Sequence, residues 1–374
     1  MDILFLNWKD LNNPEVGGAE IIAFEFAKRL ASEGHTITLF SRSFEDALEK
    51  EIIDSVHVVR RGNRFSVYFE AFLYYRSLSH KPDVVIDMIN TLCWQTPLYV
   101  PREKRLAYVN QLAKEVLFFE FPWPLSWIAY FLERYEYLPY KDTRFICYSK
   151  STKEDLQSFG IPSKNISTFP LGLDHKRYIP GKKKSSFPLF IFVARLVKMK
   201  RADLCIKAMK QVVKKYNNAK LVIIGSGQDE KRLRSIVETY ELTNHVTFLT
   251  KDTFYFKKDH KDKKVTLMQE AWAHILPSVK EGWGMVVTEA AACGTPSIVS
   301  DVTGLRDSVQ KNKSGIILSK NPTETELADS MVRLIENKQL RDKLTKQSIE
   351  WANTYDWDTS YKEFKKVVLN THTK

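Results

Sequence analysis

The stretch 276-LPSVKEGWGMVVTEAAACGTPSIVS-300 holds two carboxylates, Glu281 and Glu289, eight positions apart around a Gly-x-Gly. Its apolar pattern predicts a strand over 273–277, a loop, and a helix over 285–293 that ends at a glycine. The first turn of a helix carries unpaired N–H groups and a partial positive charge, which together favour a bound phosphate. The pattern therefore predicts a phosphate- and sugar-binding loop.

The residues of this loop suit different parts of such a ligand. Gly282 and Gly284 have no Cβ, so the backbone can approach a ligand closely. Glu281, before the helix, can accept hydrogen bonds from sugar hydroxyls, and Glu289, just over one turn inside it, can accept two from a ribose. The alternative is a helix whose acidic start is favoured by the macrodipole without any ligand.

Two cations follow the strand expected over 189–194. Arg195 and Lys200 are five residues apart, so a folded loop can aim both at one diphosphate. Arginine supplies a bidentate fork and lysine a compact charge. The alternative is a pair of surface charges after a strand.

Short apolar runs alternate with helix-period segments along the whole chain, which predicts parallel sheets covered by helices on both faces. The expected strands are 3–7, 35–41, 84–88, 106–110, 145–149, 166–169, 189–194, 221–225, 246–249, 273–277 and 297–300. The expected helices include 18–32, 202–216, 229–240, 285–293 and 359–370. A charged loop is expected over 251–264.

A length of 374 residues suits two domains. We expect two Rossmann-like domains, over 1–172 and 189–354. The linker between them, 173–188, should have a solvated lysine triplet. A C-terminal helix is expected within 355–374 and can pack back on the first domain. Two doubly wound α/β domains place a ligand cleft at the carboxyl ends of their strands.

Composition narrows the class of protein. With 44% hydrophobic and 27% charged residues, the chain has a globular composition. No apolar run is long enough for a transmembrane helix, and the first residues of the chain have the pattern of a strand. The four cysteines are scattered, which suits a reducing compartment. We therefore expect a cytoplasmic protein. The net charge of +12 indicates an anionic partner, but no nucleic-acid-binding motif is present, so nucleic acid is not expected.

The first stretch resembles the E-x7-E signature and following A-C-G-T-P of family 4 glycosyltransferases. Three further stretches resemble family segments in the expected order, so that the resemblance covers nearly the whole chain: 193-VARLVKMKRADLCIKAM-209, 34-GHTITLF-40 and 301-DVTGLRDSV-309. It implies the GT-B fold, two Rossmann-like domains that face each other across a cleft. The chain departs from the family pattern at Ala194 and Arg201, where glycine is usual, and Arg201 puts the geometry of the local turn in question.

The resemblance also implies roles for individual residues. Glu289 would hold the nucleotide ribose, Glu281 would contact the donor sugar, and Arg195 and Lys200 would act on the diphosphate. The remaining implied donor contacts are the Gly17-Gly18 loop and the backbone amides of Gly282, Trp283, Gly284, Met285 and Val286. Gly304 and Arg306 would shape a neighbouring loop.

Asn110 stands where many members of the family carry a histidine near the donor sugar. An asparagine can hydrogen-bond a sugar hydroxyl but does not titrate near neutral pH. Asn110 therefore either keeps a positioning role, which we favour, or lowers the activity.

The activity implied is the transfer of a hexose-type unit from a nucleotide sugar to a glycan or lipid-linked acceptor, with retention at the anomeric carbon. The resemblance implies neither a metal ion nor a cofactor. Asp356-Trp357-Asp358 forms a D-x-D of the kind that binds metal in other transferases, but it precedes a helix, so we expect Asp358 to be that helix's N-cap. The alternatives are a GT-B sugar-nucleotide 2-epimerase and a catalytically weak nucleotide-binding or regulatory subunit.

The stretch 116-VLFFEFPWPLSWIAYFLERYEYLPY-140 holds ten aromatic residues and two central prolines. In the domain that receives the acceptor, it could dock a lipid-linked acceptor or lie on an anionic membrane, which would place the protein on the inner membrane face. The alternative is a helical hairpin buried in the core.

Overall fold

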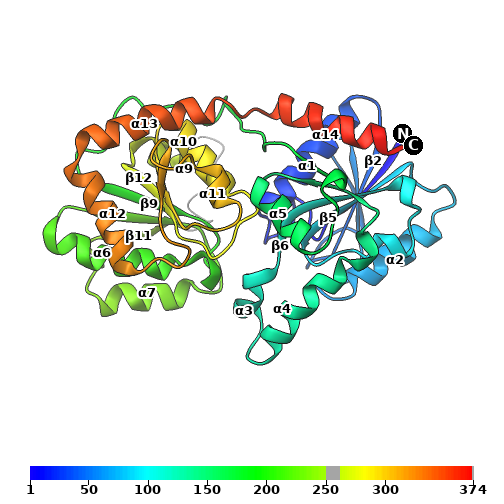
Figure 1. Cartoon of the computed structure of the whole chain (residues 1–374), viewed down its shortest axis with the longest axis horizontal. Helices are drawn as coiled ribbons and strands as arrows, with labels where there is room; N and C mark the ends of the chain where they lie inside the picture. Colours follow the sequence, from blue (N-terminus) through cyan, green and yellow to red (C-terminus); the bar gives the residue numbers. More distant parts are fainter. Residues whose placement is uncertain (250–261, 373–374) are drawn as a thin grey trace. The chain divides into compact units, whose positions relative to one another are not determined.

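The structure is a computed structural model that describes residues 1–249 and 262–372 (Figure 1). The chain divides into two compact units. Unit 1 comprises Met1–Pro170 and Asp358–Lys374, and unit 2 comprises Leu171–Trp357. Each unit has a mixed α/β architecture built on a largely or wholly parallel sheet.

Unit 1 contains an eight-stranded sheet in the order β3-β4-β2-β1-β5-β6-β7-β8. Its strands are β1 Asp2–Leu6, β2 Thr36–Ser41, β3 Lys50–Ile53, β4 Val56–Arg60, β5 Val84–Thr91, β6 Arg105–Leu112, β7 Arg144–Cys147 and β8 Ile166–Thr168. Its α-helices are α1 Gly18–Ser32, α2 Val67–Ser77, α3 Leu117–Glu120, α4 Leu125–Glu136, α5 Lys150–Ser158 and α14 Trp357–His372. All strand pairs are parallel except β3 with β4.

The central strands of unit 1 are largely apolar because helices cover both faces of the sheet. In β1, for example, Ile3, Leu4, Phe5 and Leu6 are all buried. The strands β3 and β4 were not expected from the sequence. They form an edge hairpin in which β3 alternates between exposed and half-buried residues, so its apolar signal is weak.

Unit 2 contains a six-stranded, all-parallel sheet in the order β11-β10-β9-β12-β13-β14. Its strands are β9 Leu189–Val193, β10 Lys220–Ile224, β11 Val246–Leu249, β12 Ala273–Leu276, β13 Ser297–Val299 and β14 Gly315–Ile317. Its described α-helices are α6 Ala202–Lys215, α7 Glu230–Thr239, α9 Lys263–Glu270, α10 Met285–Ala292, α11 Leu305–Ser308, α12 Glu324–Glu336 and α13 Lys338–Ala352. One apolar core joins the strands to α6, α10 and α12.

Two segments differ from their expected form. The stretch expected as a linker, 173–188, groups with unit 2, where Ser185 donates its backbone N–H to the Glu270 carbonyl at 2.9 Å. Its third lysine is not solvated: the Lys184 ammonium donates to the Thr295 hydroxyl at 2.6 Å, and burial lowers the pKa of Lys184 to about 7. Most of the charged loop expected over 251–264 lies outside the described residues, but its last two residues already belong to α9.

The C-terminal helix α14 packs on unit 1, beside α1 (Figure 1). The rings of Phe364 and Phe26 stack with centroids 4.2 Å apart, and Lys365 pairs with Glu33 at 2.7 Å. The expectation that Asp358 caps this helix is wrong, because the helix begins at Trp357 and the Asp358 carboxylate instead accepts from Arg29 at 2.6 Å.

Two acids have raised pKa values: the buried Asp87, and the half-buried Glu136 at the end of α4. Asp87 on β5 accepts from the Thr96 hydroxyl at 2.9 Å and from the Tyr140 hydroxyl, and burial raises its pKa to about 6. One carboxylate oxygen of Glu136 is buried with no hydrogen-bond partner among the described residues, and burial, with the charge of Glu133, raises the pKa of Glu136 to about 7. Protonation of these acids therefore stabilises unit 1.

We expect Glu136→Gln to stabilise unit 1 at pH 8 by on the order of 2 kcal/mol. The folded-state pKa of Glu136, about 7, lies above its ordinary value of 4.5, so its stabilising contribution is complete below pH 4.5 and is lost as the pH rises through 7. A neutral glutamine should therefore flatten the fall in melting temperature between pH 4.5 and 8, as measured by thermal unfolding. The control is the exposed Glu45→Gln, and an unchanged pH profile for Glu136→Gln would contradict the assignment.

Candidate active site

The first turn of α10 presents free hydrogen-bond donors. Gly284 precedes the helix in the left-handed region, with φ of 83°, and a Cβ there would lie 2.8 Å from the Leu305 side chain. The backbone N–H groups of Gly284, Met285 and Val286 donate to no described residue. Because α10 follows β12, these donors lie at the carboxyl edge of the parallel sheet, where such sheets bind ligands.

The loop after β13 packs against the segment that leads into α10. Gly304 has φ of 81°, and a Cβ there would lie 2.4 Å from the Glu281 carbonyl oxygen. The Glu281 N–H donates to the Thr303 carbonyl at 3.3 Å, and Arg306 pairs with Asp301 at 3.2 Å within the loop. Gly304 and Arg306 thus shape this loop, and any side chain at position 304 would push it away from the Gly-x-Gly segment.

Glu281 and Lys200 meet, although 81 residues separate them in the sequence. The Glu281 carboxylate accepts from the Lys200 ammonium at 2.5 Å and from the Ser278 hydroxyl at 2.8 Å, and both charged side chains are largely buried. The carboxylate is therefore held in place, with one oxygen carrying both contacts.

Arg195 and Arg201 differ in their surroundings. Arg195 is exposed just after β9, and its side chain makes no ion pair with any described residue. Arg201 adopts φ of 55°, the left-handed conformation expected of the glycine it replaces, and its guanidinium donates to the Pro322 carbonyl at 3.0 Å. The turn therefore forms despite the arginine, at a cost of about 1–2 kcal/mol, and Arg201 is engaged elsewhere, whereas Arg195 is free to meet an anion.

Glu289 is paired with a lysine that the sequence did not single out. The Glu289 carboxylate accepts from the Lys264 ammonium at 2.6 Å, and Lys264 also lies 3.1 Å from the Tyr178 hydroxyl. Burial alone would lower the pKa of Lys264, but the charge of Glu289 and the contact with Tyr178 outweigh it and hold the pKa above its ordinary value. The available signal was that Lys264 is the second residue of a short amphipathic segment, KKVTLMQE, that follows a charged stretch.

The neighbouring His274 is neutral. Burial, with the charge of Lys264 as a second cause, lowers the pKa of His274 to about 3, and its ring lies 3.0 Å from the Ser297 hydroxyl. Lys264 and Glu289 are therefore the charged pair at this point of unit 2. Trp283 is also buried, with its ring edge-on to Tyr355 at 5.5 Å between centroids, so its side chain supports the loop.

Unit 1 carries the predicted glycine loop, in which one amide is already occupied. The N–H of Gly17 donates to the Glu20 carboxylate at 2.7 Å, and Gly18 is the exposed first residue of α1. Glu20 is buried and lies 3.9 Å from the Lys9 ammonium. Neither Glu20 nor Lys9 was singled out from the sequence, although a glutamate three residues after a helix cap is a known capping signal.

Asn110 lies at an irregularity of the sheet. Val109 pairs with Ile89 and Gln111 with Asn90, so Asn110 is left without a partner on β5, as in a β-bulge. Its side-chain oxygen accepts from the Tyr148 hydroxyl, while its buried amide nitrogen has no partner among the described residues. That nitrogen can donate to a bound hydroxyl.

Tyr148 contacts Asn110 and is affected at longer range by the charge of Glu20. Burial first, and the charge of Glu20 among the lesser causes, raises the pKa of Tyr148, so Glu20 lies within electrostatic range of the Asn110–Tyr148 pair. Unit 1 therefore gathers Asn110 and the start of α1 in one region at the carboxyl side of its sheet.

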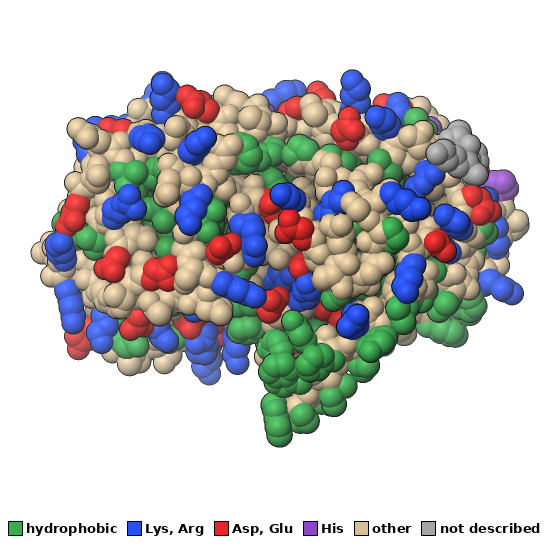
Figure 2. Space-filling model, in the orientation of Figure 1, with side chains coloured by type: hydrophobic (Ala, Val, Ile, Leu, Met, Phe, Trp, Pro, Cys, Tyr) green, Lys and Arg blue, Asp and Glu red, His purple; other side chains and the backbone are tan. Residues whose placement is uncertain are grey.

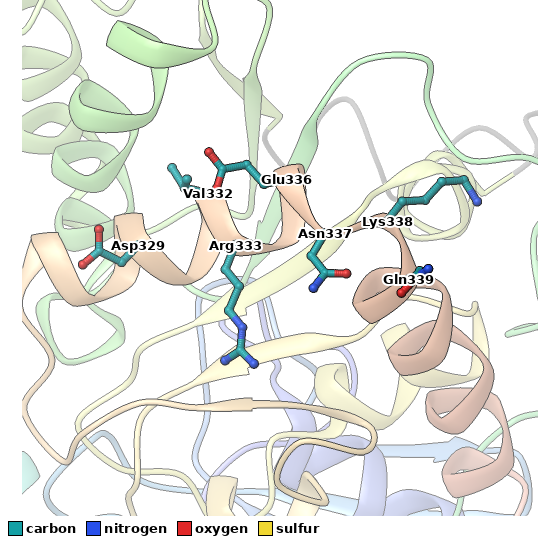
Figure 3. A pocket seen from close by; sticks show the side chains of 7 residues that line it. All are labelled: Asp329, Val332, Arg333, Glu336, Asn337, Lys338 and Gln339. Carbon is teal, nitrogen blue, oxygen red and sulfur yellow. The ribbon is translucent and has the colours of Figure 1, made fainter.

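Other features contribute nothing to this site. A surface hollow of about 580 Å³ at the turn between α12 and α13 is lined by Asp329, Val332, Arg333, Glu336, Asn337, Lys338 and Gln339 (Figure 3), and it contains none of the predicted residues. Across residues 1–249 and 262–372, no three His, Cys, Asp or Glu side chains are grouped so that they could hold a metal ion. Within the same ranges, no helix has the length and apolarity to cross a membrane.

Comparisons with known proteins match both units. The model of Glycosyltransferase Family 4 matches residues 16–177, and that of Glycosyl transferases group 1 matches residues 177–351. A curated relative, the phosphatidylinositol N-acetylglucosaminyltransferase gpi3 subunit of Schizosaccharomyces pombe, is 22% identical over 86% of this chain and 70% of its own length.

Solved structures share the fold. Sucrose-phosphate synthase from Thermosynechococcus elongatus has a TM-score of 0.79 at 18% identity, over 98% of both chains. Anabaena HepE, solved in complex with UDP and glucose, has a TM-score of 0.72 at 18% identity, over 98% of this chain and 99% of its own. The two family models and these structures agree with the resemblance seen in the sequence: the chain belongs to family 4 of the glycosyltransferases and is a glycosyltransferase enzyme with the GT-B fold.

Proposed function

We propose that the protein transfers a sugar from a nucleotide sugar to a glycan or lipid-linked acceptor, with retention at the anomeric carbon and without a metal ion or cofactor. The observation that carries the proposal is the start of α10, where three free N–H groups stand one turn before the buried Glu289 carboxylate. That arrangement suits a phosphate next to a ribose. HepE, a structural neighbour, binds UDP.

Each predicted residue then has a distinct task. Glu289 accepts the ribose hydroxyls, and Arg195 with Lys200 offsets the charge that builds on the leaving diphosphate. Glu281, which the Ser278 hydroxyl and Lys200 hold in place, orients the donor sugar. In unit 1, the free Asn110 amide and the exposed Gly18 contribute further donor contacts.

The reaction proposed needs no covalent intermediate on the enzyme. The acceptor hydroxyl forms a bond to the anomeric carbon on the face that the diphosphate leaves, the bond from that carbon to the diphosphate oxygen breaks, and the hydroxyl proton passes to this oxygen. The protein supplies position and electrostatic stabilisation. The cationic Arg195 and Lys200 take the place that a metal ion has in other nucleotide-sugar transferases.

A lipid-linked acceptor is the finer part of the proposal. The relative from Schizosaccharomyces pombe is named for a phosphatidylinositol substrate, and unit 1 exposes an aromatic hairpin. We accordingly propose that the protein works in the cytoplasm, at the inner face of a membrane. A sugar-nucleotide 2-epimerase would convert the donor with no acceptor present, and a non-catalytic subunit would bind the nucleotide without turnover, so product analysis separates both from a transferase.

Thermal unfolding with UDP, GDP and ADP, each measured with and without EDTA, should identify the nucleotide of the donor. A nucleotide at 100 times its dissociation constant stabilises the folded protein by about 2.7 kcal/mol. We expect one nucleotide to raise the melting temperature and EDTA to leave that rise unchanged. A rise that EDTA abolishes would contradict metal independence, and the absence of any rise would contradict the nucleotide site.

Glu289→Ala and Glu281→Ala should affect different steps. Without Glu289 the ribose contacts are lost, and nucleotide binding should weaken about 10- to 100-fold, as measured by calorimetry. Without Glu281 the donor sugar is misplaced, so kcat should fall at least about 100-fold while nucleotide affinity changes little. Glu238→Ala, on the exposed face of α7, is the matched control. Unchanged nucleotide affinity in Glu289→Ala would rule out the ribose assignment.

Lys264→Met should destabilise unit 2 by about 3 kcal/mol, because it leaves the buried Glu289 carboxylate unpaired. The double variant Lys264→Met/Glu289→Gln removes that charge and should recover most of the stability. We expect it to keep the weakened nucleotide binding, since a glutamine cannot accept two ribose hydroxyls as a carboxylate does. If the two substitutions instead act additively on the melting temperature, the pair contributes nothing to the positioning of Glu289.

A further inference from the structure

The hairpin of α3 and α4 exposes most of its large apolar side chains. Among the described residues, 21 large apolar side chains are exposed, and eleven of them lie within residues 118–138. The eleven are Phe118, Phe119, Phe121, Trp123, Leu125, Trp127, Ile128, Phe131, Leu132, Tyr135 and Leu138. The alternative that this segment is buried in the core is therefore wrong.

The hairpin is firmly rooted and projects from unit 1. The buried Glu133 carboxylate accepts from the backbone N–H groups of Ala113 at 2.7 Å and Lys114 at 2.6 Å, which ties α4 to the end of β6. Beyond this root the aromatic rings pack on one another, as Phe118 does on Trp127 with centroids 4.9 Å apart. Figure 2 shows the result as a projection whose visible surface is almost entirely apolar.

Charge is absent from the tip of the hairpin and returns near its root. Residues 121–132 include no Asp, Glu, Lys or Arg. Toward the root, Arg134 is exposed on α4, and the exposed Arg64 lies 3.8 Å from Glu120 at the end of α3. An apolar tip with arginines behind it matches the order of acyl chains and anionic headgroups across one leaflet of a membrane.

A second apolar stripe begins beside this hairpin. Phe65, two residues before α2, and Phe69 and Leu73 on α2 follow one another at four-residue spacing, and all three are exposed. Because Arg64 precedes Phe65 and contacts Glu120, the start of the stripe adjoins the end of α3. The apolar surface therefore extends beyond the hairpin onto α2.

We propose that the α3–α4 hairpin inserts its tip into the interfacial region of an anionic lipid bilayer, with Arg64 and Arg134 at the level of the headgroups. Tryptophan and tyrosine, present here as Trp123, Trp127 and Tyr135, are the side chains enriched at that depth. The net charge of +12 favours an anionic surface. A projection suits insertion into lipid better than the flat, self-complementary surface of a dimer. The inference does not depend on the sugar transferred.

The test is co-sedimentation of the full chain with vesicles of phosphatidylcholine alone or mixed with phosphatidylglycerol. We expect binding to the mixed vesicles, weakened by salt, and a loss of about 100-fold in the partition coefficient for Trp127→Ser/Phe131→Ser. Leu48→Ser/Leu98→Ser replaces two equally exposed leucines elsewhere in unit 1 and should bind as the wild type does. Arg64→Gln/Arg134→Gln should lower binding to the mixed vesicles about fivefold for each arginine and hardly affect binding to the neutral ones.

Thermal unfolding with the donor nucleotide distinguishes a loss of lipid binding from a loss of folding. A hairpin variant that stays folded should show the melting temperature and the nucleotide response of the wild type. The proposal is overturned if the wild type binds neither kind of vesicle, or if Trp127→Ser/Phe131→Ser binds as the wild type does. It is also overturned if sedimentation velocity shows a dimer that this variant dissociates while lipid binding is unaffected, because the hairpin would then be a contact between two copies.

Discussion

The carboxyl ends of parallel strands all lie at one edge of a sheet, and the candidate site in unit 2 depends on this geometric constraint. The loops after β9, β12 and β13 come from stretches separated by up to about a hundred residues, yet their side chains and backbones touch. One of these approaches is between Gly304 and the Glu281 carbonyl, where no Cβ fits. This contact fixes the backbone that leads into α10, and so it fixes the direction of the free N–H groups.

Two lysine–glutamate pairs set the electrostatics of that edge. Lys200 with Glu281 and Lys264 with Glu289 each place opposite charges in largely buried surroundings, where a lone charge would be costly. In each pair, one carboxyl oxygen of the glutamate accepts a hydrogen bond from the lysine. If Lys200 binds the diphosphate as proposed, a bound diphosphate would compete with Glu281 for the Lys200 ammonium.

Unit 1 combines a buried, largely apolar sheet with an exposed aromatic hairpin. Its sheet consists of largely apolar strands that bury one acid, Asp87, while the hairpin that follows β6 turns most of its aromatic rings outward. The link between them is Glu133, whose carboxylate holds the last turn of α4 to the backbone that follows β6. Asn110 lies on the same strand, at the bulge, so the element that carries the candidate sugar contact also carries the hairpin.

The sequence by itself determined the order and type of the elements, because burial on both faces makes parallel strands apolar throughout and the helices between them carry an apolar stripe. It also singled out candidate site residues, since their spacing belongs to local loops and helix starts: Glu281, Glu289, Arg195, Lys200 and the glycines. The edge strand β3 was not predicted because a half-exposed strand has a weak apolar signal, and the short strands β4 and β14 were not predicted although they are mostly buried.

Only the tertiary structure decided which residues far apart in the chain meet. Lys264 reaches Glu289, Lys200 reaches Glu281, and Asp358 pairs with Arg29 instead of capping its helix. It also decided that most of the aromatic segment over 116–140 is exposed. The apolar pattern of a segment is the same whether the segment packs in the protein core or against another surface, so the sequence alone does not distinguish the two. Side-chain chemistry is local and visible in the sequence, whereas pairing across long separations depends on how the sheet brings its loops together.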